Sequence, residues 1–73
     1  MILPTKHISL TNSYLGSGMT VLQALSAPMS VNKLWKAVGF KANIANPRRF
    51  YFTLDLLYML GAIELKDGKI QRT

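Results

Sequence analysis

The sequence predicts a mainly α-helical fold that ends in a small β-hairpin. Three runs of apolar residues recur at helical spacing, and residues that favour helix starts precede each run. The last twelve residues instead alternate apolar and polar side chains around an Asp-Gly pair, which is typical of a tight hairpin. A chain of 73 residues forms one domain with a small core, so its stability on its own should be marginal.

Residues 1–11 are expected to form an N-terminal arm that precedes a domain over residues 12–73. Within the arm, "KHISL" alternates enough for a short strand, and Pro4 restricts the residues before it to an edge position. A lone histidine in such a segment, His7, is more typical of a surface or capping residue than of a catalyst.

The first helix is predicted over about residues 12–26. Gly16 and Gly18 each weaken a helix by up to about 1 kcal/mol relative to Ala, so they indicate either a close approach of another segment or an irregular first turn. The candidate N-caps are Thr11, Asn12 and Ser13, and the expected apolar spacing is Leu15, Met19, Leu22 and Leu25, with Gly18 and Val21 beside it.

The second helix is predicted to begin after Ser30, a good N-cap, and to end near Gly39. The "PMS" stretch before it is expected to form a short strand that joins the hairpin. The buried stripe is expected to comprise Val31, Leu34, Trp35 and Val38, with Lys33 and Lys36 pointing outward.

The third helix is predicted from Pro47 to Leu60, with Asn46 as N-cap and Gly61 as the C-terminal stop. A helix that is apolar on all sides is expected to be buried on all sides. Either a partner protein covers the second face, or the first helix and the arm do. The expected core face is Phe50, Leu54, Leu57 and Tyr58, and the opposite apolar side is Phe52, Leu56, Met59 and Leu60.

The hairpin is predicted to turn at Asp67 and Gly68 and to cover the core with Ile63, Leu65 and Ile70. A short strand, three helices and a two-stranded hairpin, in this order, make the layout of a winged helix-turn-helix domain.

The residue types exclude most catalytic chemistry. The chain has no cysteine and one histidine, and its three carboxylates, Asp55, Glu64 and Asp67, are not arranged in a catalytic or metal-binding motif. We therefore expect no enzyme activity, no cofactor, no metal and no small-molecule substrate. Polar residues interrupt the apolar segments too often for a membrane span, and no signal peptide is recognisable, so a soluble cytoplasmic protein is expected.

The net charge of +6 favours a polyanion or an acidic protein surface as partner, although such charges can also serve solubility alone. The third helix carries no base-reading side chain beyond its first turn, so contact with double-stranded DNA would be non-specific and directed at phosphates. The candidates for phosphate contact are Arg48, Arg49, Lys66, Lys69 and Arg72.

The opening "MILPTKHI", the "LW" of the second helix and the closing "LDLLYMLGAIELKDGKI" resemble the small middle component of bacterial ABC-three-component systems, in particular its sixth family. The resemblance implies a gene beside an SMC-like or Rad50-like ATPase and an effector, often a nuclease, in defence against phage and plasmids. Lamassu-type systems are the best-known relatives. It also implies a non-catalytic adaptor, for which no catalytic residue is carried over.

Two hypotheses follow. An adaptor would bind its partners through apolar residues of the arm and of the third helix, whereas a free-standing winged-helix transcriptional regulator would dimerise to read a palindrome. A protein that binds a membrane surface is disfavoured, because no helix places more than two basic residues opposite an apolar face. The candidate interface residues of the adaptor are Ile2, Leu3 and Ile8 of the arm and Phe52, Leu56 and Met59 of the third helix.

Overall fold

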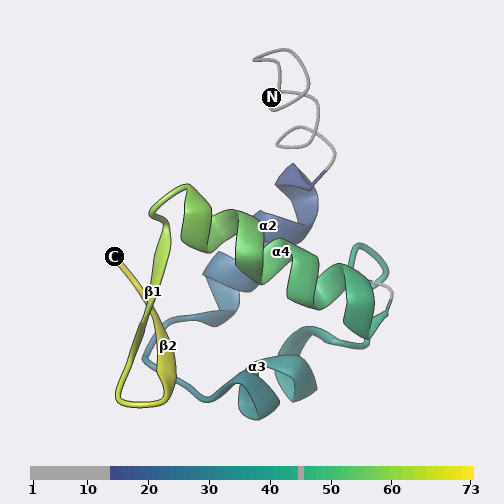
Figure 1. The fold of residues 1–73 in the computed structure, drawn as a ribbon. Helices are drawn as coiled ribbons and strands as arrows, with labels where there is room; N and C mark the ends of the chain where they lie inside the picture. Colours follow the sequence, from purple (N-terminus) through teal and green to yellow (C-terminus); the bar gives the residue numbers. More distant parts are fainter. Residues whose placement is uncertain (1–13, 45) are drawn as a thin grey trace.

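The computed structural model describes residues 14–44 and 46–73, and within them it confirms three helices followed by an antiparallel hairpin. In Figure 1, α4 crosses in front of α2, α3 lies below them, and the hairpin stands beside the C-terminal end of α4. This arrangement fits the predicted winged-helix description. The predicted arm, with its "KHISL" strand, lies outside the described residues. The elements are α2 (Leu15–Ala24), α3 (Val31–Val38), α4 (Pro47–Met59), β1 (Ile63–Lys66) and β2 (Lys69–Arg72).

Capping side chains set the starts of α3 and α4, as predicted. Ser30 Oγ accepts a hydrogen bond from the backbone N–H of Lys33 at 3.2 Å, and Asn46 Oδ1 accepts one from the N–H of Arg49 at 2.8 Å. Helix α4 ends at Met59, with Leu60 as its C-cap, and the next residue, Gly61, has a φ of +75° that few other residues adopt without strain. Helix α2 has no side-chain cap at Tyr14, and the candidate caps Thr11, Asn12 and Ser13 lie outside the described residues.

The hairpin is closed by the predicted Asp-Gly turn. Asp67 and Gly68 both have positive φ, +53° and +74°, as a two-residue turn that matches the strand twist requires. On its other side, β2 pairs with the connector between α2 and α3: Met29 N–H donates to Ile70 O at 3.0 Å, and Ile70 N–H donates to Met29 O at 2.8 Å. The predicted short strand at "PMS" is therefore present as this bridge.

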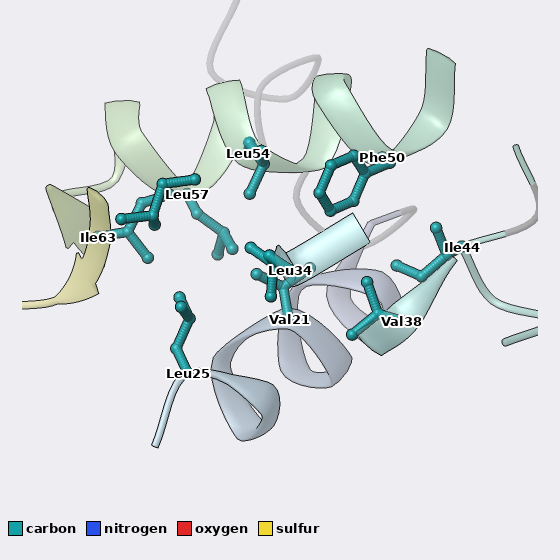
Figure 2. Packing of buried hydrophobic residues seen from close by; sticks show 10 residues of the cluster. Val21, Leu25, Leu34, Val38, Ile44, Phe50, Leu54, Leu57 and Ile63 are labelled. Atoms are coloured by element: carbon teal, nitrogen blue, oxygen red, sulfur yellow. The ribbon is translucent and has the colours of Figure 1, made fainter. Parts of the chain in front are cut away.

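The core lies between the three helices and is closed at one end by the hairpin (Figure 2). Helix α2 packs against α3 and α4, while β1 packs on α4. The ring of Phe50 lies 5.2 Å from that of Trp35 and is fully buried. Each large apolar side chain buried in this way contributes about 1.5–3 kcal/mol. The cluster comprises Val21, Leu25, Leu34, Val38, Ile44, Phe50, Leu54, Leu57, Ile63 and Ile70.

The predicted inner face of α2 is wrong in part. Leu15 and Met19 are 57% and 53% exposed, whereas Ser17, Gly18 and Val21 are buried. The reason is the close approach of α4: a Cβ atom at Gly18 would lie 3.3 Å from Leu57 Cδ2. Small residues therefore mark the buried side of this helix, and its larger side chains are left at the edge of the contact.

Two further residues expected in the core are exposed. Tyr58 is 62% exposed and Leu65 is 64% exposed. Ile70, the cross-strand partner of Leu65, is buried because β2 is covered by Met29 on its second edge. Leu65 lies beside the turn, two residues further from α4 than Ile63, which is 5% exposed on the same strand, so only Ile63 and Ile70 close the core.

Candidate protein-interaction surface

An apolar groove of about 210 Å³ separates the outer edge of α2 from one side of α4. Two of the residues that α2 leaves exposed, Leu15 and Met19, form one wall, and Leu60, 48% exposed, lies on the opposite wall. Hydrophobic side chains thus face solvent on both sides of a concave surface. We call this the α2–α4 groove, lined by Tyr14, Leu15, Gly18, Met19, Leu22, Leu56, Leu57, Leu60 and Ala62.

A polar junction holds α2 to the start of α4 at one end of this groove. Arg49 Nε donates to Ser17 Oγ at 3.1 Å and to the backbone oxygen of Asn43 at 2.9 Å. The guanidinium carbon of Arg49 lies 4.4 Å from the centre of the Tyr14 ring, a cation–π distance. Arg49, predicted to contact phosphate, therefore connects three segments of its own chain.

The hydroxyl of Ser17 completes the junction by donating to the same Asn43 oxygen at 2.6 Å. The Asn43 side chain in turn donates to Gly16 O at 3.1 Å, and Thr53 Oγ1 donates to Arg49 O at 2.8 Å. Among the described residues, every buried side-chain nitrogen or oxygen has a hydrogen-bond partner. Such a satisfied network fixes the angle between α2 and α4, and with it the width of the groove.

The predicted interface residues of α4 lie in different environments. The Phe52 ring stacks on Tyr14, with centroids 5.3 Å apart, and Phe52 is 48% exposed, so it adjoins the α2–α4 groove. Met59 is 70% exposed on the outer face of α4. Leu56 is only 8% exposed and lines the groove, where it offers little surface of its own. Ile2, Leu3 and Ile8 lie outside the described residues.

The comparisons with known proteins now decide the family. The family model described as "ABC-three component (ABC-3C) system Middle Component 6" matches residues 3–73, nearly the whole chain. The chain belongs to this middle-component family. No curated protein and no solved structure gives a match. The match supports the resemblance seen in the sequence at the level of the ABC-three-component system, and a middle component has partners within that system.

The remaining basic candidates of this middle component are separated by the length of α4. Arg48 is exposed in the first turn of the helix, while Lys66, Lys69 and Arg72 are exposed on the hairpin that follows its last turn. The backbones of Lys66 and Lys69 face each other across the hairpin, next to the turn. A helix of 13 residues spans about 20 Å, so these cations flank α4 rather than form one cluster.

Metal-binding clusters and membrane-spanning helices are both absent from the part of the middle component that the structure describes. Residues 14–44 and 46–73 contain no group of three or more His, Cys, Asp and Glu side chains placed to hold a metal ion. None of the helices in the same ranges has the length and hydrophobicity needed to cross a membrane.

Sequence reasoning missed Leu15 and Met19 as surface residues of this site, and it placed Leu60 on the second apolar face of the third helix without including it among the candidate interface residues. A usable signal was present in "LGSGM", residues 15–19, because three small residues in a row allow another helix to approach closely. Placing those small residues on the buried side turns Leu15 and Met19 toward the edge of the contact.

Proposed function

We propose that this middle component is a non-catalytic adaptor that joins an SMC-like or Rad50-like ABC ATPase to an effector, often a nuclease, in cytoplasmic defence against phage or plasmids. Lamassu-type systems would be relatives. The observation that carries the proposal is the α2–α4 groove, whose walls keep Leu15, Met19 and Leu60 about half exposed. A small domain that exposes apolar side chains around a groove needs a protein surface to cover them.

The energetics of the groove favour a protein partner. Burying the exposed half of side chains such as Met19 and Leu60 would contribute about 1 kcal/mol each, given about 1.5–3 kcal/mol for complete burial of a large apolar side chain. A few well-packed residues of this kind usually dominate the affinity of an interface. The polar junction at Arg49 holds the two walls in place before binding, which reduces the entropy lost on association.

Contact with double-stranded DNA would be secondary and non-specific. Arg48, Lys66, Lys69 and Arg72 are exposed and could reach phosphates on either side of α4, whereas Arg49 would act by positioning the start of the helix. Between these cations the exposed residues of α4 are Tyr51, Phe52, Asp55, Tyr58 and Met59, none of which is a usual donor to base edges in the major groove.

Co-purification with the products of adjacent genes tests the adaptor. The tagged wild-type chain should retain the ATPase or the effector, and Met19→Glu and Leu60→Glu should each weaken retention about 30-fold, as expected for loss of about 2 kcal/mol at an interface hot spot. Phe40→Glu is the matched control, because Phe40 is 78% exposed and lines neither this groove nor the groove between α4 and the hairpin.

The competing hypothesis, a transcriptional regulator, predicts the opposite behaviour. A chain that purifies alone as a folded homodimer, and that prefers one DNA sequence at physiological salt, would overturn the adaptor proposal. Circular dichroism of each Glu variant shows whether the fold is retained, so that loss of binding is not confused with unfolding.

A further inference from the structure

A second groove, of about 230 Å³, lies between α4 and the hairpin. Its floor is apolar: Leu54, Ile63 and Ile70 are between 5% and 9% exposed. Tyr58 and Leu65 stand at its edges and are more than 60% exposed. This volume is several times the roughly 30 Å³ share of one water molecule, so the groove can hold a large side chain. We call it the α4–hairpin groove.

The charge of this groove is opposite to that of the chain. The protein has nine Lys and Arg against three Asp and Glu, yet among the described residues that line the groove Asp55 is acidic and none is Lys or Arg. Glu64 also borders the groove, but successive side chains of a strand point to opposite faces, and Glu64 pairs with Gln71 on the face opposite Ile63 and Ile70. Asp55 is exposed and has no cationic partner within the described part of the chain, so its charge is available to a ligand.

This placement argues against DNA as the ligand. In a winged-helix domain, the third helix and the wing are the elements that would meet a duplex, and here their shared groove presents the Asp55 carboxylate to the phosphates. Like charges brought together at an interface oppose binding. The same carboxylate would attract a cationic side chain held next to an apolar one.

We propose that the α4–hairpin groove is a second docking site, and that it binds a segment of a partner protein in which an apolar side chain is flanked by Lys or Arg. The apolar side chain packs on Leu54, Ile63 and Ile70, while a basic residue pairs with Asp55. This inference goes beyond the proposed function: it assigns a separate surface and a distinct ligand chemistry to the side of α4 away from the α2–α4 groove.

Site-specific cross-linking in cells that express the whole gene cluster tests the proposal. Tyr58 is replaced by the photoreactive residue p-benzoylphenylalanine, and the cross-linked peptide is identified by mass spectrometry. The expected product is a protein segment with Lys or Arg within about one helical turn of an apolar residue. The same replacement at Tyr51, which is exposed on α4 but lines neither groove, should not give this product.

Charge substitution then tests the chemistry with a synthetic peptide of the cross-linked segment. Asp55→Asn should weaken binding about threefold at low salt, the effect expected of one ion pair at a partly covered interface. Asp67→Asn is the matched control, because it removes the same charge from the hairpin outside the groove, and Asn tolerates the positive φ of this position. Asp55→Lys should restore binding to a peptide whose basic residues are replaced by Glu.

The outcomes separate this inference from the proposed function. A cross-link to DNA, to this chain itself or to an acidic segment, or no cross-link at Tyr58, would overturn the docking site. A basic, apolar segment of a protein encoded outside the gene cluster, confirmed by the charge exchange, would leave the docking site standing and count against the adaptor. Loss of co-purification in Met19→Glu with the Tyr58 cross-link unchanged would show that the two grooves act independently.

Discussion

The α2–α4 groove and the α4–hairpin groove are similar in volume but differ in chemistry. Leu56, Leu57 and Leu60 contribute to the first, while Leu54, Asp55 and Tyr58 contribute to the second. At 100° per residue these two sets lie on opposite sides of α4, with the core-facing stripe around Phe50 between them. Helix α4 is thus apolar almost all round because it bounds a core and two grooves, and only one groove carries charge.

Binding at the two grooves should respond differently to salt. Apolar contact is nearly independent of screening, whereas ion pairs at a surface weaken as the Debye length falls from about 10 Å at 0.1 M to about 3 Å at 1 M salt. A partner held at both sites should therefore lose only one of its contacts in high salt, and the one that remains should depend on Met19 and Leu60.

The largest effect on stability is expected at Phe50, because it lies in the core stripe of α4 between the two grooves. Phe50→Ala removes a fully buried ring that contacts Trp35, and it should lower the free energy of unfolding by about 3–5 kcal/mol, enough to unfold much of so small a domain. Urea denaturation followed by circular dichroism measures the loss. Tyr51→Ala, at the adjacent half-exposed position whose ring lies 5.4 Å from that of Phe50, should lower it by only about 1 kcal/mol, and equal effects would contradict the core assignment.

Two adjacent arginines are expected to differ in role. Arg49 stabilises the α2–α4 groove, whereas Arg48 can contact DNA. Arg49→Ala removes the donor to Ser17 Oγ and one of the two donors to the Asn43 carbonyl, and it should lower the free energy of unfolding by about 1–3 kcal/mol. Arg48→Ala should change it by less than about 0.5 kcal/mol while weakening retention on a duplex of any sequence at low salt. Unfolding curves that coincide for the two variants would contradict the structural role of Arg49.

A smaller effect on stability, which should affect both grooves alike, is expected at the N-terminus of α4. Asn46→Ala removes the side-chain cap on the Arg49 N–H and should lower the free energy of unfolding by about 1 kcal/mol, whereas Asn46→Ser should retain most of it. Thermal denaturation with the two variants side by side measures this difference. A full loss in the Ser variant would mean that Asn46 acts by something other than capping.

Much of this fold could be predicted because local chemistry marks its boundaries. Ser30 and Asn46 cap the helices that were expected to follow them, Gly61 ends α4, and the Asp67–Gly68 turn sets the hairpin register. Each of these residues acts on backbone within a few positions of itself, so the sequence contains the whole interaction.

The two grooves could not be predicted in the same way, because each depends on how two distant elements are rotated against each other. Leu15 and Met19 have the same spacing as a core stripe, and only the approach of Leu57 to Gly18 and the hydrogen bond from Ser17 to Asn43 turn them outward. Leu65 has the same alternation as Ile63 on the same strand, but it lies beside the turn, further from α4, and is exposed while Ile63 is buried. Apolar residues have the same spacing whether they line a surface groove or the core, so their spacing alone cannot distinguish the two.

The smallest effect on stability is expected from substitutions of exposed side chains that distinguish the binding roles of the two grooves. Met19→Gln and Leu65→Gln alter side chains that are more than half exposed, one in each groove, so each should change the free energy of unfolding by less than about 0.5 kcal/mol. In pull-downs from the whole gene cluster, Met19→Gln should reduce retention at all salt concentrations. Leu65→Gln should reduce it mainly at low salt, where the Asp55 carboxylate in the same groove still attracts a basic segment. Identical salt profiles for the two variants would mean that one continuous interface, rather than two separate grooves, covers α4.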